Sequence, residues 1–94
     1  MDEVTKGQVI HFCYIAECAD GTYYTGYTTD ITGRVKAHNE GRGAKYTRSR
    51  LPVLIVYSEE FASKSDAMKR EVEIKRMSRS AKDALIAGGK PKND

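Results

Sequence analysis

The sequence predicts an α+β fold, in which a small three-stranded antiparallel sheet is flanked by helices in the order β-β-α-β-α-α. Three observations lead to this fold class. Two runs rich in β-branched and aromatic residues within residues 9–28 are separated by an Asp-Gly pair, which is a strong hairpin signal. A further strand-like run occupies residues 51–58. Residues 30–39, 63–77 and 80–87 carry helix start and stop signals.

The first two strands are expected at Val9–Cys18 and Thr22–Thr28, joined by a turn at residues 19–21. Even spacing preserves a face along a strand, so Tyr14 and Tyr24 are predicted to lie on the same side of the sheet. The opposite side receives the other two tyrosines of the hairpin, Tyr23 and Tyr27. Tyrosine pairs across a hairpin are usually packing residues, and that interpretation stays open at this point.

The next helix is expected at residues 30–39, with Asp30 as its cap and Gly41 ending it. Residues 41–50 combine glycine, basic and hydroxyl residues without periodicity, so they are predicted to be a loop. The third strand is expected at Leu51–Ser58, and its proline near the start is typical of an edge strand.

Two helices are expected to complete the fold. Ser63 or Ser65 can cap the first, which runs to about Met77. The second covers Ser80–Ala87 and is ended by Gly88-Gly89.

The chain has 94 residues, which is room for one domain. We expect residues 1–94 to form a single domain with a core at about residues 9–87 and a disordered tail at residues 88–94. No stretch approaches the roughly 18 apolar residues of a membrane helix, and the acidic N-terminus lacks the apolar region of a signal peptide. We therefore expect a cytoplasmic protein that does not bind membranes.

The two cysteines agree with this compartment. Cys13 and Cys18 are five residues apart in one predicted strand, so they project from opposite faces and lie roughly 16 Å apart. They cannot pair with each other, and two free thiols fit a reducing cytosol. Neither has the spacing of a zinc site, and both are interpreted as packed side chains.

Positive charge is concentrated in residues 31–52, where six basic residues face one acidic residue, while the rest of the chain is slightly acidic. The six are Arg34, Lys36, Arg42, Lys45, Arg48 and Arg50. Such a segment is typical of a phosphate-binding face, and a solvated loop is an equally good interpretation from charge alone.

The helix at residues 63–77 places charge where apolar residues belong. With Ala67 at 0°, Glu71 falls near 40° and Lys75 near 80°, within an apolar stripe completed by Met68, Val72 and Ile74. A buried carboxylate is costly unless it is paired or binds a metal. Either a Glu71–Lys75 ion pair or a metal or catalytic site explains this pattern.

The helix at residues 30–39 shows the same anomaly. Arg34 and His38 are four residues apart, so they stack on one face beside the apolar residues Ile31 and Val35. A satisfied rim histidine and an extended surface arginine are the simpler interpretation. Two helices that each turn ionisable groups toward the sheet favour a shared site instead.

At this point the sequence resembles a known family. Phe12-Cys13-Tyr14, and ten residues later Tyr24-Thr25-Gly26, resemble the two tripeptides that name the GIY-YIG nuclease superfamily. Arg34 and His38 on the following helix, and Glu71 on the next long helix, complete the pattern over roughly residues 9–78. The chain looks most like the small stand-alone bacterial subfamily, the YhbQ type.

The resemblance implies a role for each residue. Glu71 would bind one divalent metal, Mg²⁺ or Mn²⁺. Tyr14 would help to activate the attacking water, and Tyr24 would orient the scissile phosphate or the nucleophile. Arg34 would stabilise charge on the phosphoryl oxygens, and His38 would assist proton transfer. Gly26 would allow close backbone approach at the end of the second strand.

This chemistry is coherent on physical grounds. Phosphodiester hydrolysis needs an activated water and neutralisation of the phosphate, and one carboxylate is enough to hold one Mg²⁺. The tyrosine pKa near 10 makes it a poor base at pH 7 unless a neighbour lowers it. The chain departs from the family in Phe12 and Cys13, in lacking an asparagine after Glu71 on that helix, and in having no second domain.

These features favour a metal-dependent endonuclease that hydrolyses the phosphodiester bonds of DNA, rather than RNA, in repair or recombination. The first alternative is a non-catalytic nucleic-acid-binding module. The residues expected to contact the backbone in either case are Arg42, Lys45, Tyr46, Arg48, Arg50 and Lys75. The second alternative is a nuclease subunit that depends on a protein partner, docked by the helix at residues 80–87.

Overall fold

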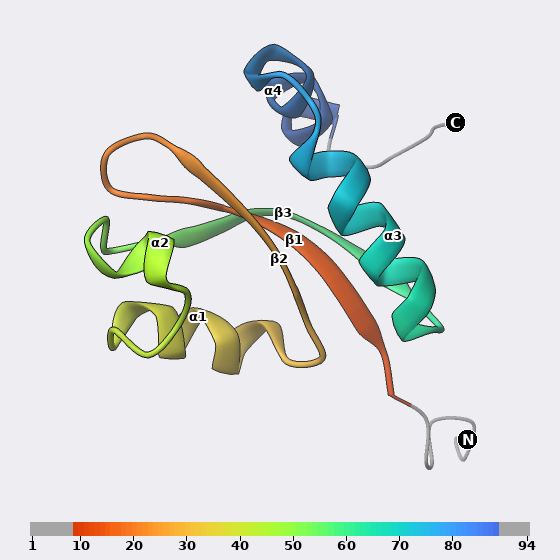
Figure 1. The fold of residues 1–94 in the computed structure, drawn as a ribbon, viewed down its shortest axis with the longest axis horizontal. Coiled ribbons are helices and arrows are strands. Elements are labelled where there is room, and N and C mark those ends of the chain that lie inside the picture. The colour runs from red at the N-terminus through yellow and green to blue at the C-terminus, as the bar shows by residue number, and fades with distance from the viewer. Residues whose placement is uncertain (1–8, 89–94) are drawn as a thin grey trace.

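The computed structural model of the chain describes residues 9–88, which form one sheet and four helices (Figure 1). In chain order the elements are β1 (His11–Glu17), β2 (Tyr23–Thr28), α1 (Ile31–Asn39), α2 (Lys45–Arg48), β3 (Leu54–Phe61), α3 (Lys64–Lys75) and α4 (Arg79–Gly88). The predicted three-stranded antiparallel sheet with flanking helices is confirmed.

The sheet has the strand order β2-β1-β3, with β1 in the centre. In the β1–β2 ladder Tyr14 lies opposite Gly26, and Ala16 lies opposite Tyr24. Because side chains alternate between the two faces, Tyr14 and Tyr24 share one face, as predicted. The pairing of β1 with β3 shifts by one residue after Ile15, which is a β-bulge.

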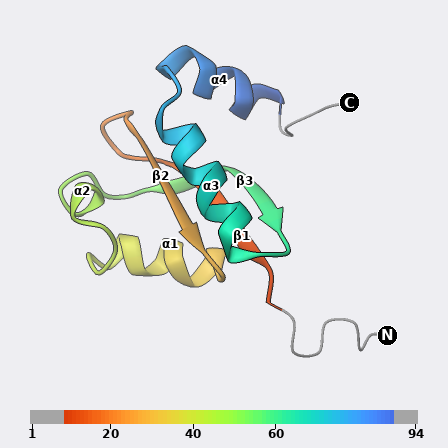
Figure 2. The ribbon, with the colours of Figure 1, turned by 45° about the vertical axis from the view of Figure 1, so that its right-hand side comes forward.

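Helices cover both faces of the sheet, so the fold has three layers (Figures 1 and 2). The face with α1 has a core of four buried residues, Tyr14, Ala16, Cys18 and Val53. The face with α3 and α4 has a second core of Cys13, Ile15, Tyr57 and Ile74. The two cysteines are free, buried and in separate cores, which confirms that they pack and do not pair.

The helix boundaries follow the capping residues of the sequence. The Asp30 side chain accepts a hydrogen bond from the Gly33 amide at 3.1 Å, which confirms the predicted cap of α1. Gly41 ends this helix with φ 80°, a conformation that glycine adopts without a steric penalty. Of the two candidate caps of α3, Ser63 is the one used, and its hydroxyl accepts from the Asp66 amide.

The prediction of a continuous loop at residues 41–50 is wrong, because residues 45–48 form the short helix α2. One helical turn is too short to show an apolar period. It is held locally, since the Thr47 backbone and side chain both donate to the Ala44 carbonyl.

The third strand begins three residues later than predicted, at Leu54, and continues to Phe61. The backbone N–H and carbonyl of Val53 bond to the side-chain amide of Asn39 at 2.7 and 3.1 Å, which ties Val53 to α1. The strand extends to Phe61 because β1 reaches far enough to pair His11 with it.

Smaller differences affect the ends of elements. β1 is shorter than the predicted Val9–Cys18, because Val9 and Ile10 are exposed and outside the ladder. α3 ends at Lys75 and not at Met77, and α4 covers Arg79–Gly88 and so includes the first residue of the expected tail. The rest of that tail, residues 89–94, lies outside the described residues.

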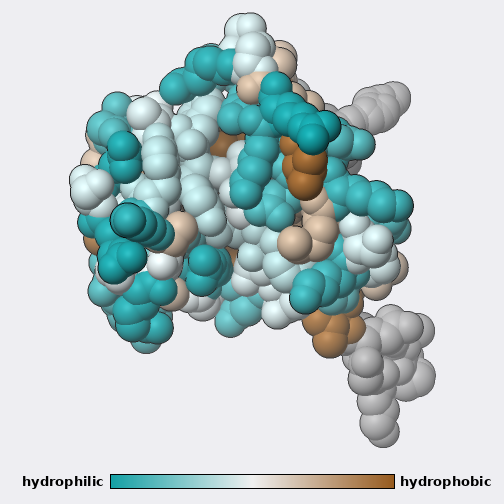
Figure 3. Space-filling model, in the orientation of Figure 1, coloured by the Kyte–Doolittle hydropathy of each residue, from teal (hydrophilic) through white to brown (hydrophobic). Residues whose placement is uncertain are grey.

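The apolar stripe predicted for α3 is too wide. Ala67 and Ile74 are fully buried, but Met68 and Val72 are 40% and 46% exposed. Figure 3 shows apolar surface over α3 and beside the start of β1 on an otherwise mostly hydrophilic face. α3 therefore touches the sheet along a narrow line through Ala67 and Ile74. No helix in residues 9–88 has the length and apolar character that a membrane span requires.

Candidate active site

Tyr14 is at the centre of the candidate site. It lies on the central strand, its side chain is fully buried, and its hydroxyl is 2.9 Å from Nε2 of His38. A Cβ added to Gly26, opposite Tyr14 on β2, would be 2.5 Å from the Tyr14 hydroxyl and 2.9 Å from the Tyr24 ring. Glycine at position 26 therefore leaves the space that the two tyrosine rings occupy.

His38 lies on α1 and is also fully buried. Its second ring nitrogen, Nδ1, is 2.9 Å from the Thr47 hydroxyl on α2. Gly43 packs against the same nitrogen so closely that an added Cβ would overlap it. Burial, and then the charge of Arg34, hold the pKa of His38 below its ordinary value, so the imidazole is neutral at pH 7.

Arg34 lies one turn before His38 on α1 and is partly buried. Interaction with the Tyr14 hydroxyl is the main reason why the pKa of Arg34 lies above its ordinary value, and Tyr24 adds to the effect. Its Nε atom is buried and has no hydrogen-bond partner among the residues that the structure describes. The site thus contains a permanent cation next to two phenols, and one of its N–H donors has no partner among the described residues.

Tyr24 joins this group from β2. Its ring centroid is 5.4 Å from that of His38 and 6.3 Å from that of Tyr14. On its other side it stacks with Tyr46 at 6.2 Å, and the Arg50 guanidinium lies 3.9 Å above the Tyr46 ring.

Tyr14 is protonated at neutral pH. Burial raises its pKa to about 12, although Arg34 acts in the opposite direction. A phenol with this pKa is not a base at pH 7 on its own. To accept a proton, Tyr14 must first give up its own proton to a neighbour. His38 is the hydrogen-bond partner of its hydroxyl.

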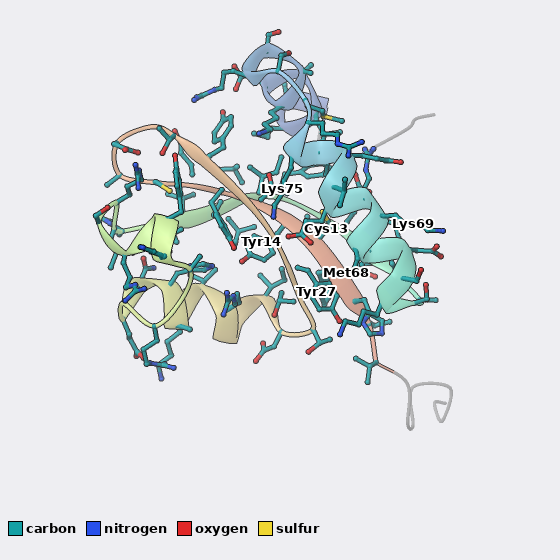
Figure 4. All side chains as sticks on the ribbon, in the orientation of Figure 1. Cys13, Tyr14, Tyr27, Met68, Lys69 and Lys75 are labelled. Atoms are coloured by element: carbon teal, nitrogen blue, oxygen red, sulfur yellow. The ribbon has the colours of Figure 1, made fainter. Side chains whose placement is uncertain are left out.

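Glu71 lies on α3, which covers the other face of the sheet from α1. Its side chain is only 12% exposed, and Oε2 is 3.1 Å from the Lys75 ammonium. The i,i+4 ion pair considered from the sequence therefore forms. Lys75 is 52% exposed, so its predicted place inside the buried stripe is wrong. Its long side chain extends from α3 back over the sheet, whereas Lys69 points away from it (Figure 4).

Glu71 is also electrostatically linked to the buried tyrosine. Its negative charge is among the smaller causes, after burial, that raise the pKa of Tyr14 and of Cys13. Within residues 9–88 no three histidine, cysteine, aspartate or glutamate side chains gather into a metal site. The donor set that the site offers a metal is therefore a single, nearly buried carboxylate. This suits Mg²⁺, which keeps several waters and takes phosphate oxygens as further ligands.

An open cleft of about 280 Å³ passes the edge of β2 next to this site. Tyr24 and Tyr46 line it from the side of α1 and α2, while Lys75 and Lys82 line it from α3 and α4. Lys82 was not singled out in the sequence, because no local pattern indicates that the first turns of α4 lie beside β2. The cleft joins basic and aromatic side chains, as surfaces that track a nucleic-acid backbone do.

The other basic residues expected to contact nucleic acid differ in their surroundings, since two are in ion pairs and two are exposed on α2. Arg42 pairs with Glu40, and Arg50 pairs with Asp20 at 3.2 Å. Arg50 also donates to the Tyr46 carbonyl, so it contributes to holding α2. Lys45 and Arg48 are exposed on α2.

Comparison with known proteins shows the family to which the chain belongs. Residues 10–84 match the GIY-YIG catalytic domain family. A UPF0213 protein of Halobacterium salinarum is 59% identical over 77 residues, which are 82% of this chain and 100% of that protein. A UPF0213 protein of Staphylococcus haemolyticus is 54% identical over 76 residues, or 81% of this chain and 93% of that protein.

A solved structure is similar as well. The solution NMR structure of a UPF0213 protein from Bacillus halodurans is 49% identical, covers 87% of this chain and 88% of its own, and has a TM-score of 0.56. The resemblance first noted in Phe12-Cys13-Tyr14 and Tyr24-Thr25-Gly26 is thereby confirmed over most of the chain. This protein belongs to the GIY-YIG family.

Proposed function

We propose that this protein is an endonuclease that hydrolyses phosphodiester bonds of DNA with one divalent metal, Mg²⁺ or Mn²⁺. The observation that carries the proposal is the buried Tyr14–His38 hydrogen bond beside the Arg34 guanidinium, whose Nε has no partner among the described residues. This arrangement pairs a proton-transfer couple with a cation for the phosphate, which are two needs of phosphodiester hydrolysis.

Each residue has a defined task in this reaction. Arg34 binds a phosphoryl oxygen and stabilises the charge that grows on it. Tyr14 and His38 together accept one proton from the attacking water. The resulting hydroxide forms a bond to phosphorus, the bond from phosphorus to the 3′ oxygen breaks, and that oxygen takes a proton from solvent. Tyr24 positions the phosphate against these groups.

Glu71 is the residue that would hold the metal. The ion pair with Lys75 engages Oε2, so Oε1 is the oxygen that remains for an ion. Lys75 is half exposed and can move its ammonium away at little cost. A bound Mg²⁺ or Mn²⁺ would supply charge neutralisation and orientation of the phosphate.

We place the bound nucleic-acid strand in the cleft at the edge of β2. Lys75 and Lys82 would contact phosphates, and the tyrosines offer surfaces for bases. The basic and aromatic lining of this cleft suits either DNA or RNA. We propose DNA as the substrate because the chain belongs to a family of nucleases. A role in repair or recombination predicts that the protein cleaves branched DNA.

The experiment that tests this proposal uses the purified full chain with end-labelled single-stranded, duplex and branched DNA, with Mg²⁺ or Mn²⁺ or with EDTA. Glu71→Gln is compared with Glu73→Gln, a matched change of an exposed carboxylate on the same helix. We expect metal-dependent cleavage that Glu71→Gln abolishes and Glu73→Gln preserves. Equal activity of the two variants, or activity in EDTA, would contradict the assignment.

A non-catalytic binding module is the second candidate. It is favoured by the raised pKa of Tyr14 and by the Lys75 ammonium already paired with Glu71. This candidate predicts salt-sensitive DNA binding that Glu71→Gln leaves unchanged, without cleavage under any of these conditions. Cleavage that appears only when cell extract is added would indicate a nuclease subunit that needs a protein partner.

A further inference from the structure

The Thr47 hydroxyl has two partners, and its single proton can go to only one of them. It is 2.9 Å from the Ala44 carbonyl oxygen and 2.9 Å from Nδ1 of His38. A carbonyl oxygen only accepts hydrogen bonds, so the Thr47 proton is donated to Ala44. The same oxygen must then accept from His38, which means that Nδ1 carries the imidazole proton.

This assignment determines the state of the other ring nitrogen. A neutral imidazole carries one N–H, and the burial of His38 next to Arg34 keeps it neutral. Nε2 therefore presents a lone pair to the Tyr14 hydroxyl at 2.9 Å, and Tyr14 is the donor. The hydrogen bonds run in one direction, from Tyr14 to His38, from His38 to Thr47, and from Thr47 to Ala44.

We propose that Thr47 is a positioning residue that holds His38 in the Nδ1–H tautomer and so keeps Nε2 free to take the proton of Tyr14. The proposal rests on the nuclease function above. In the reaction, the Tyr14 proton moves to Nε2, the water proton moves to the Tyr14 oxygen, and the hydroxide attacks phosphorus. His38 becomes an imidazolium with both nitrogens hydrogen-bonded, and it returns its proton to solvent after the cut.

The opposite tautomer would block this path. With a proton on Nε2, His38 would donate to the Tyr14 oxygen, and the Tyr14 proton would have no acceptor there. Gly43 packs against Nδ1 and restricts the space beside it, so Thr47 is the acceptor that the described residues provide at this nitrogen. Thr47 is itself fully buried, so solvent does not compete for its hydroxyl.

The test compares Thr47→Val, which keeps the shape and removes the hydroxyl, with Thr47→Ser, which restores the hydroxyl. The tautomer is measured by NMR of the protein with ¹⁵N-labelled histidine, with the two histidine signals assigned through a His11→Asn variant. We expect the Nδ1–H pattern for His38 in the unsubstituted protein and in Thr47→Ser. In Thr47→Val we expect a shift toward Nε2–H.

Cleavage gives the second readout. We expect Thr47→Val to lower kcat at least about tenfold with KM little changed, because a lost proton acceptor affects the chemical step. Thr47→Ser should retain most of the activity. Amide spectra and thermal unfolding of both variants show whether the fold is kept, and a misfolded Thr47→Val is replaced by Thr47→Ala in the same comparison.

Two results would overturn the proposal. One is a His38 that keeps the Nδ1–H form in a folded Thr47→Val protein, and the other is a changed tautomer with an unchanged kcat. Failure of the unsubstituted protein to cleave would overturn the nuclease function instead. In that case the NMR comparison would still decide whether Thr47 controls the protonation of His38.

Discussion

Tyr14 is held in a setting that favours its neutral form when the protein is folded. Its ring is fully buried, and burial raises its pKa to about 12. A phenol whose pKa is higher in the folded than in the unfolded chain contributes stability that is complete below the unfolded value near 10. That contribution is lost as the pH rises from about 10 to about 12.

We therefore predict that the free energy of unfolding falls by about 2–3 kcal/mol from Tyr14 between pH 10 and pH 12. Tyr14→Phe should show a shallower decrease over this range, since phenylalanine does not titrate. The measurement is urea unfolding at several pH values, with Tyr27→Phe as the control. Equal slopes for Tyr14→Phe and the unsubstituted protein would contradict the burial of this hydroxyl.

Gly26 offers a second test at a single position. An added Cβ would be 2.5 Å from the Tyr14 hydroxyl and would also contact the Tyr24 ring. Both rings are packed, so they cannot move aside freely, and we predict that Gly26→Ala destabilises the protein by about 1–3 kcal/mol and abolishes cleavage. Thermal unfolding and the cleavage assay measure the two effects. Gly88→Ala, where a Cβ would meet nothing within 4 Å, is the control and should stay within about 0.5 kcal/mol.

α3 is attached to the sheet by a largely buried ion pair as well as by Ala67 and Ile74. Arg70 binds the Glu59 carboxylate on β3 through Nε and Nη2, at 3.0–3.1 Å, and the Glu59 side chain is only 7% exposed. Arg70 directly precedes Glu71, so this contact also fixes the part of α3 from which the candidate metal ligand projects.

Removing one partner of this pair leaves a buried charge. We predict that Arg70→Ala destabilises the protein by about 3–5 kcal/mol, because Glu59 loses its counter-charge in a dry environment. Glu73→Ala removes only the exposed half of the Arg70 interactions and should cost less than about 1 kcal/mol. Urea unfolding of the two variants is the measurement. Similar losses in both would mean that Glu59 is not a buried charge in solution.

α4 is attached to the β1–β2 hairpin by a compact cluster of contacts. Arg79 lies 3.8 Å above the Tyr23 ring and donates to the Gly21 carbonyl at 2.8 Å, while the Tyr23 hydroxyl donates to Asp83. These contacts bring a helix that has no fully buried residue to the edge of β2. They therefore place Lys82 in the cleft.

The cleft is lined by side chains from elements that are far apart in the sequence. Lys75 and Lys82 line it together with Tyr24 and Tyr46. We predict that Lys82→Met weakens DNA binding and lowers the slope of log K against log salt by about 1, because one phosphate contact is lost. Fluorescence anisotropy in EDTA separates this effect from cleavage.

Lys69→Met is the matched control for this measurement. Lys69 lies on α3 and points away from the sheet (Figure 4), so its removal changes the net charge by the same amount without changing the cleft. An equal change in the salt slope for both lysine variants would indicate general attraction of DNA to a basic protein. This result would mean that the bound DNA lies somewhere other than the cleft.

Much of this structure follows from local patterns in the chain. Asp30, Ser63 and Gly41 mark helix ends, because a cap depends on residues within one turn. Alternation along β1 and β2 places Tyr14 and Tyr24 on one face, since the strand period is two residues. The family motif then brings Arg34, His38 and Glu71 into consideration as site residues.

Other features depend on contacts between residues far apart in the chain. Met68 and Val72 are exposed because α3 contacts the sheet along a narrow line. The helical period shows which residues share a face, but it does not show how wide the contact with the sheet is. The start of β3 depends on Asn39, which bonds to the backbone of Val53, 14 residues later. Gly43 and Thr47 contact His38 because the segment that contains them, including α2, folds back over α1. The sequence of this segment has no periodicity that would predict such contacts.

The difference has one physical cause. Caps, turns and strand faces are governed by interactions over a few residues, and the amino acids in those positions carry the information directly. The partners of His38, the depth of Glu71 and the lysines of the cleft depend on how the helices pack on the two faces of the sheet. That packing is settled by the shape and burial of side chains from the entire chain, and so it appears only when the chain is folded.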